Sequence, residues 1–91
     1  MADLMIYSIG ILATIFAVSS TIPQILKALR TKKTDDVSIW LVIVLITGLG
    51  FWVAYGIVKN DIVLIGGNSI AVLLNSILLV LKIKYSRNPL S

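Results

Sequence analysis

The sequence contains no cysteine and no histidine, and only 13% of its 91 residues are charged. Without cysteine there are no disulfides and no thiolate metal sites, and without histidine the commonest metal ligand and near-neutral base is missing. We therefore expect no metal site and no cofactor, and we do not expect an enzyme.

Hydrophobic residues are abundant, at 58% of the chain, which is more than a soluble domain of this size can bury in one core. Charge-free stretches at 4–26, 37–58 and 62–81 are each about 20 residues or longer, enough to cross a hydrocarbon layer of about 30 Å. The sequence predicts an all-α membrane protein, a three-helix bundle in one unit over 1–91, with helices near 4–29, 37–58 and 62–83.

Basic residues predict how the chain is oriented in the membrane. The first stretch is not expected to be a cleaved signal peptide, because its lead-in holds Asp3 and no basic residue. By the positive-inside rule the amino terminus lies outside, and the first connection and the carboxyl tail lie in the cytoplasm, as expected of a multi-pass protein of the inner membrane. Lys59 is the one basic residue on the outer side, and the inner ones are Lys27, Arg30, Lys32, Lys33, Lys82, Lys84 and Arg87. Because no aromatic residues interleave with them, the net charge of +4 does not indicate nucleic-acid binding.

The two connections differ in length. The polar segment 31–36 joins the first two helices, and Asp36 or Ser38 can cap the second. The turn at 59–61 is so short that the second and third helices must form an antiparallel hairpin, with Asp61 as the cap of the third. Since three helices cannot enclose an aqueous path, transport would require an assembly, and we expect a dimer.

Trp52 and Asn68 stand about six residues from their helix ends on either side of this turn, which predicts the same depth in the membrane. An aromatic ring stacks on the C–H face of a sugar while a carboxamide bonds its hydroxyls, so the pair predicts a sugar site. In the alternative interpretation, Asn68 links helices and Trp52 anchors the interface, a role that suits Trp40 better.

Helical spacing groups further polar residues. Gly48, Trp52, Tyr55 and Lys59 follow steps of four, three and four, while Asp61, Asn68 and Asn75 are seven apart. Both stripes are expected to face away from lipid, because an unpaired carboxamide in hydrocarbon costs several kcal/mol.

Pro23 lies near the inner end of the first helix and removes a backbone hydrogen bond there. A kink or hinge, with Gln24 beside the freed carbonyls, is favoured over a helix stop, because the sequence after Pro23 remains compatible with a helix.

Candidate gates lie on either side of the Trp52 and Asn68 level. Tyr55, Lys59 and Asp61 gather near the outer mouth, where they form either an outer gate or a solvated turn. Ile39 and Ile43 are candidates for an apolar inner gate, being only approximately in phase with Gly48.

Two segments resemble the Pro-Gln loop signature of SemiSWEETs, the bacterial half-size SWEET sugar transporters. They are TIPQILK at 21–27 and KKTDDVS at 32–38. Trp52 and Asn68 extend this similarity over nearly the whole chain. The resemblance implies a parallel homodimer with a mono- or disaccharide bound between two Trp52 and two Asn68, a hinge at Pro23, and gates above and below the sugar. It places Tyr55, Asp61 and Lys59 at the outer gate.

The expected function is therefore facilitated sugar diffusion by alternating access in a homodimer. The expected partners of the chain are a second copy of itself, the sugar and membrane lipid. No Asp, Glu or His occurs within 4–26, 37–58 or 62–81, which argues against proton coupling. Two alternatives remain: a Pro-Gln loop exporter of cationic amino acids, and a helper subunit that transports nothing itself.

Overall fold

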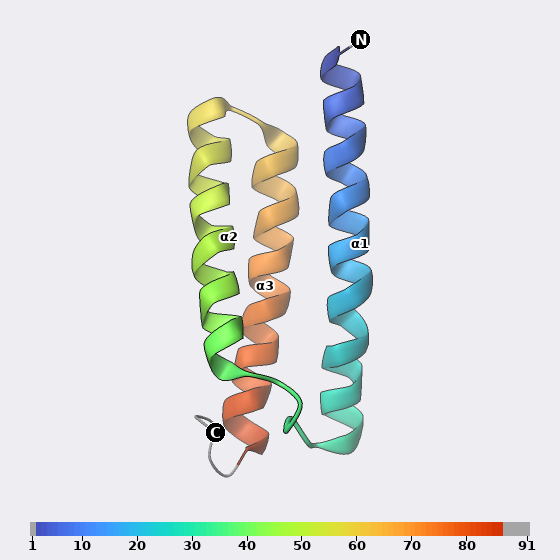
Figure 1. Ribbon diagram of the computed structural model, residues 1–91, viewed down its shortest axis with the longest axis vertical. Coiled ribbons are helices and arrows are strands. Elements are labelled where there is room, and N and C mark those ends of the chain that lie inside the picture. The colour runs from blue at the N-terminus through green and yellow to red at the C-terminus, as the bar shows by residue number, and fades with distance from the viewer. Residues whose placement is uncertain (1, 87–91) are drawn as a thin grey trace.

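Three helices make up the fold in the computed structural model, which describes residues 2–86. They are α1 (Ala2–Thr31), α2 (Ile39–Lys59) and α3 (Ile62–Tyr85), and no strand occurs among the described residues (Figure 1). All three are long and apolar enough to cross a membrane. The expected all-α membrane fold is thus confirmed, while Arg87 lies outside the described residues.

The beginnings of α2 and α3 are set by side-chain caps. Ser38 has extended backbone, and its hydroxyl accepts a hydrogen bond from the Leu41 N–H at 3.3 Å, so α2 begins at Ile39 rather than at 37. The Asp61 carboxylate accepts from the N–H groups of Val63 and Leu64 at 3.0 and 3.2 Å. Of the two candidate caps for α2, Ser38 is therefore the one used.

The turn between α2 and α3 is closed by Asn60, whose backbone is left-handed at φ 55° and ψ 44°. Its N–H donates to Ile57 O at 3.1 Å, and the next N–H, of Asp61, donates to Gly56 O at 2.9 Å. These bonds satisfy the last carbonyls of α2, as in a Schellman-type helix end. The hairpin of α2 and α3 that the short turn predicts is present.

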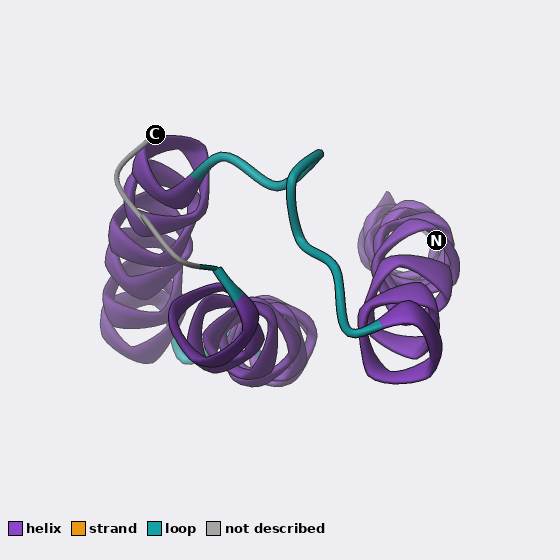
Figure 2. Ribbon diagram, turned by 90° about the horizontal axis from the view of Figure 1, so that it is seen from below, coloured by secondary structure: helices purple, strands orange, loops and turns teal. Residues whose placement is uncertain are grey.

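α3 lies between the other two helices and packs against both, whereas α1 and α2 do not pack on each other. Viewed along the helices, α3 forms the base of a trough whose sides are α1 and α2 (Figure 2). The first connection crosses one end of this trough (Figure 2). The three helices therefore form a single curved layer.

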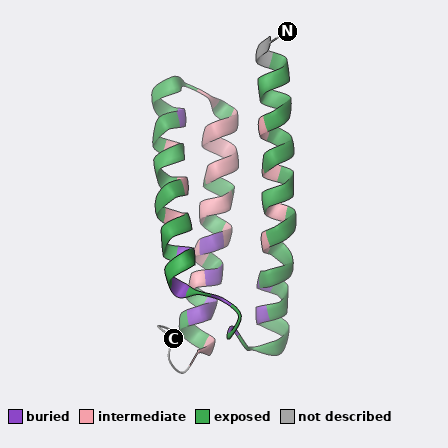
Figure 3. Cartoon of the chain, viewed as in Figure 1, coloured by how far each residue is buried: buried purple, intermediate pink, exposed green. Residues whose placement is uncertain are grey.

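The buried apolar core is small and lies at the end where α1 ends and α2 begins, which we call the inner end because the sequence predicts that it faces the cytoplasm (Figure 3). Its buried residues are Ile25, Ala28, Val37, Val42, Leu78 and Leu81. Most large apolar side chains further out are exposed, among them Phe16, Phe51 and Val58. Such exposure fits a surface covered by lipid or by a second copy rather than by water.

Two bonds hold the first connection against the helices. The Lys82 ammonium at the end of α3, only 2% exposed, donates to the backbone oxygen of Thr34 at 2.9 Å. Lys27 of α1 forms an ion pair with Asp36 at 2.8 Å. The segment between α1 and α2 is thus tied to both α3 and α1.

Candidate functional site

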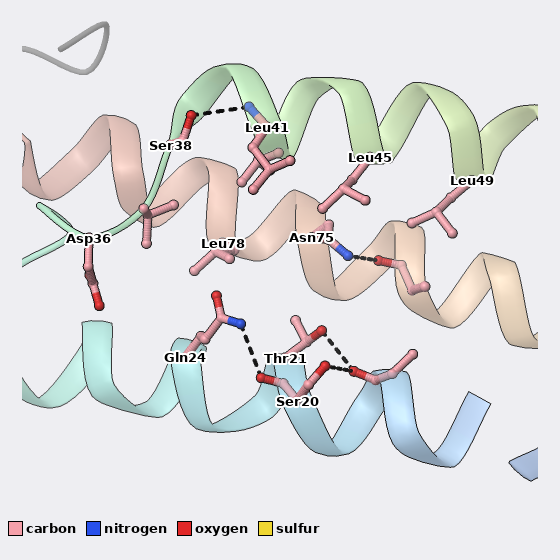
Figure 4. A pocket seen from close by; sticks show the side chains of 14 residues that line it. Ser20, Thr21, Gln24, Asp36, Ser38, Leu41, Leu45, Leu49, Asn75 and Leu78 are labelled. Atoms are coloured by element: carbon pink, nitrogen blue, oxygen red, sulfur yellow. Dashed lines mark hydrogen bonds between the residues drawn. The ribbon is translucent and has the colours of Figure 1, made fainter. Parts of the chain in front are cut away.

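The trough contains a cavity of about 310 Å³ in its inner half, between α1 and α2 and above α3. In Figure 4 Ser20, Thr21 and Gln24 extend from α1 toward this cavity, and leucines of α2 extend from the opposite side. The structure gives its lining as Ala17, Ser20, Thr21, Gln24, Asp36, Val37, Ser38, Leu41, Val42, Leu45, Leu49, Ala71, Asn75 and Leu78. We refer to it as the inner cavity.

A second cavity, of about 260 Å³, continues the trough outward between α1 and α3. It shares Ala17, Leu49 and Ala71 with the inner cavity, so the two form one continuous groove. This outer cavity is lined further by Gly10, Ala13, Thr14, Val63, Leu64, Gly67 and Asn68. The groove therefore runs along most of the length of α3 on one face of the protomer.

Asn68 and Asn75 both lie on the groove face of α3, as their spacing of seven predicts. Each carboxamide donates to its own helix, Asn68 to Leu64 O and Asn75 to Ala71 O, both at 2.8 Å. Neither is hydrogen-bonded to another helix within residues 2–86. Within one protomer, then, these side chains do not link helices by hydrogen bonds but face the groove.

Within one protomer, Trp52 and Asn68 do not line the same cavity. With Phe51 and Tyr55 it lines a shallow depression of about 320 Å³ on α2, and its side chain is 52% exposed. Trp52 follows Leu45 and Leu49, which line the inner cavity, by seven and three residues, so it shares their face of α2. Its pairing with Asn68 around one sugar remains a prediction.

The outer residues of α2 stack along one face, as their spacing predicted. The rings of Trp52 and Tyr55 meet edge to face, with centroids 5.6 Å apart and planes at 87°, and the Lys59 ammonium lies 5.9 Å from the Tyr55 centroid. The Asp61 carboxylate is engaged as the cap of α3. These contacts position the proposed outer gate, but no described contact joins Lys59 to Asp61.

α1 continues through Pro23 to Thr31, so the alternative of a helix stop at Pro23 is wrong. The turns before it are rich in side-chain bonds to carbonyls: Ser20 and Thr21 both donate to Ala17 O, and Gln24 donates to Ser20 O at 3.2 Å. The carbonyl that Pro23 leaves without an N–H is that of Ser19, four residues earlier, so these bonds lie on either side of it and do not replace the one lost. Gln24 also lines the inner cavity, and its role at a hinge remains a prediction.

Ile39 and Ile43, the candidates for an inner gate, line neither cavity. Ile39 is buried at the start of α2, and Ile43 is 37% exposed. The inner mouth of the groove is lined instead by Asp36, Ser38 and Leu41. A hydrogen bond from Lys27 lowers the pKa of the Asp36 carboxyl, so this side chain is ionised and paired at the mouth.

Several groove residues were missed by reasoning from the sequence. Ser20 and Thr21 lie four and three residues before Gln24, so all three fall on one face of α1. This spacing was visible in the sequence. The leucines of α2 carried no such signal, because nearly every residue around them is apolar. Among the described residues, no cluster of three or more acidic or histidine side chains could hold a metal ion.

The model of a family described as "sugar efflux transporter for intercellular exchange" matches residues 4–90. The chain belongs to this family. Its membership confirms the resemblance drawn from the Pro-Gln segment, and the family is one of transporters rather than enzymes.

Relatives within this family of sugar efflux transporters match the chain over most of its length. The sugar transporter SemiSWEET of Bradyrhizobium diazoefficiens is 33% identical, over 93% of this chain and 99% of the relative. The sugar transporter SemiSWEET of Leptospira biflexa is 32% identical, over 82% of this chain and 88% of the relative. A crystal structure of a bacterial homologue of SWEET transporters has a TM-score of 0.84 and 34% identity, and the match covers 90% of this chain and 99% of the other. The three-helix unit is thus shared with a solved member of the group.

Proposed function

We propose that this chain is a facilitative sugar transporter that works as a parallel homodimer by alternating access. The observation that carries the proposal is the continuous groove, with carboxamides of Asn68 and Asn75 facing it from α3. Polar side chains along a path through apolar helices are typical of a route for a polar solute. The relatives named as sugar transporters support a sugar as that solute.

The groove requires a second copy of the chain, because it is open along one side of the protomer. An aqueous path cannot have lipid as one of its walls, since polar groups facing hydrocarbon would lose their hydrogen bonds. A two-fold axis normal to the membrane would place two such grooves face to face and bring both Trp52 rings to the same level. The exposed Trp52 and Tyr55 rings on α2 are then positioned to meet the partner or the sugar.

In this dimer Trp52 and Asn68 bind a mono- or disaccharide, with the indole against the C–H face and the carboxamide on hydroxyls. Tyr55, Lys59 and Asp61 close the outer side. Pro23 with Gln24 gives α1 the joint about which the protomers rock, so that the site opens to one side at a time. For the inner closure, the lining by Ser38 and Leu41 favours the mouth of the groove over Ile39 and Ile43.

The transporter lies in the inner membrane with its amino terminus outside. The basic side chains Lys27, Arg30 and Lys84 belong to the end where α1 stops, and Lys59 to the opposite end (Figure 1). This bias follows the positive-inside rule. Transport is uniport, driven by the sugar gradient, because the apolar stretches contain no acidic residue or histidine that could relay a proton.

The direct test is counterflow of radiolabelled sugar with purified protein in liposomes. Uptake of glucose or sucrose without any other protein supports a transporter and excludes a mere helper subunit. Insensitivity of the uptake to an imposed pH gradient supports uniport. Absence of counterflow for a panel of mono- and disaccharides would contradict the proposal.

A further inference from the structure

The Asn75 carboxamide lines the inner cavity and takes no part in the proposed Trp52 and Asn68 site. It lies two helical turns further in than Asn68, a separation of about 10 Å along α3. Only 8% of its surface is exposed. A polar side chain buried this far within a membrane helix needs partners, since an unpaired amide in an apolar environment costs several kcal/mol.

The one hydrogen bond of the Asn75 side chain leaves an N–H and the oxygen of its carboxamide available. A carboxamide has two N–H donors and an oxygen acceptor, and one N–H of Asn75 is taken by Ala71 O. Gln24, on the facing side of the same cavity, likewise gives one N–H to Ser20 O. Each side chain therefore retains one N–H and its oxygen for a ligand between α1 and α3, a combination suited to the hydroxyl groups of a sugar.

The remaining walls of the inner cavity complement this polar pair. Leu41 and Leu45 form an apolar wall from α2, opposite the polar side chains of α1 (Figure 4). The volume of about 310 Å³ falls at the lower end of the range of small-molecule pockets. Polar groups on two sides and leucines on the third match the hydroxyl edge and the C–H face of a saccharide. None of the described lining residues is aromatic, so binding here lacks the stacking that Trp52 offers.

We propose that the inner cavity is a second saccharide station, where Asn75 and Gln24 bind hydroxyl groups of a sugar between the Trp52 and Asn68 level and the cytoplasmic mouth. This inference rests on the proposed sugar transport and adds a second position to it. A weak binding position on the inner half of the path shortens the distance that the sugar crosses unbound between the Trp52 and Asn68 site and the cytoplasm. Sugar released from Trp52 exchanges one set of hydrogen bonds for another instead of leaving them unpaired.

A single cysteine tests this station, because the chain has none of its own. Thr21→Cys places the thiol at the inner cavity, where the native hydroxyl donates to Ala17 O at 2.9 Å. Thr47→Cys is the matched control, since Thr47 makes the same type of bond, to Ile43 O at 2.9 Å, but lies outside both cavities. The rate of N-ethylmaleimide labelling is measured on the full chain in detergent, with and without glucose or sucrose.

We expect sugar to slow labelling at Thr21→Cys and not at Thr47→Cys. Protection persists when Trp52→Ala is added and is lost when Asn75→Leu is added, or Asn75→Ala should the leucine variant fold poorly. Each lost hydrogen bond of about 1 kcal/mol weakens sugar binding about fivefold. The inference is overturned if neither sugar protects Thr21→Cys, or if protection depends on Trp52 and not on Asn75. Counterflow by the parent chain tests the proposed transport separately, so transport without protection contradicts the inner station alone.

Discussion

Gly67 of α3 lies so close to Thr14 of α1 that a Cβ atom at position 67 would overlap the Thr14 hydroxyl oxygen. That hydroxyl is held in place by donating to Gly10 O at 3.0 Å. The neighbouring Gly66, in contrast, has no atom within 4 Å of the place where its Cβ would be, apart from its own stretch of helix backbone. Two adjacent glycines on one helix thus differ in whether the packing of α1 on α3 requires them.

Gly67→Ala is expected to lower the free energy of unfolding by about 1–3 kcal/mol, the usual effect of overpacking a close contact. Gly66→Ala is the matched control, and it should leave stability unchanged or raise it slightly, since alanine is the better helix former. Thermal unfolding in detergent compares the two. Adding Thr14→Ala should restore stability to Gly67→Ala, and equal losses at positions 66 and 67 would contradict the account.

Lys82→Met removes the tie between α3 and the first connection. Thr34 O keeps its bond from the Val37 N–H, but the loss of a charged donor is expected to let the segment open about tenfold more often. Limited trypsin cleavage at the exposed Lys32 and Lys33 should therefore accelerate. Lys84→Met, at an exposed lysine of the same helix end, is the control. If both variants are cleaved at the same rate, Lys82 does not hold the connection.

Asp61 can be tested separately as a cap and as a gate residue. Asparagine caps a helix about as well as aspartate, so Asp61→Asn should fold as stably as the parent, whereas Asp61→Ala loses about 1 kcal/mol. We expect Asp61→Asn to slow sugar counterflow, because it lacks the charge that Lys59 would meet across the dimer axis. Counterflow equal to that of the parent would mean that Asp61 only caps α3.

Pro23→Ala restores a backbone N–H in α1 and should stiffen it. We expect slower sugar exchange in liposomes and unchanged sugar binding by calorimetry, because the change affects the conformational step and not the site. Ile22→Ala, at the exposed neighbouring position, is the control. Exchange at the parental rate in Pro23→Ala would rule out the hinge.

Much of the fold was predictable because it depends on local signals. The apolar stretches, the short turn at Asn60 and the cap at Asp61 each act within a few residues, and the structure contains all three features. The position of α3 between α1 and α2 was not predictable, since helices that are apolar on every side do not show which face meets which neighbour. Nothing in the sequence indicated that Lys82 is buried. In the sequence analysis Lys82 is only one of several basic residues that predict the orientation in the membrane.

The candidate site was predictable in part for the same reason. The spacing of seven placed Asn68 and Asn75 on one face of α3, and steps of three and four placed Tyr55 beside Trp52. The inner gate is different, because in the proposed dimer its residues would meet across two protomers, and no spacing within one chain determines such a contact. Ile39, chosen from approximate phase alone, is buried within the protomer.

The central claim is that Trp52 and Asn68 bind the transported sugar, and counterflow of labelled glucose and sucrose in liposomes tests it most directly. Trp52→Ala and Asn68→Ala should each lower the rate about tenfold or more, which corresponds to about 1.4 kcal/mol of lost interaction. Trp40→Ala, at an exposed tryptophan near the opposite end of α2, should transport like the parent. If Trp52→Ala and Asn68→Ala remain dimeric and carry sugar as fast as Trp40→Ala, the assignment of the site is wrong.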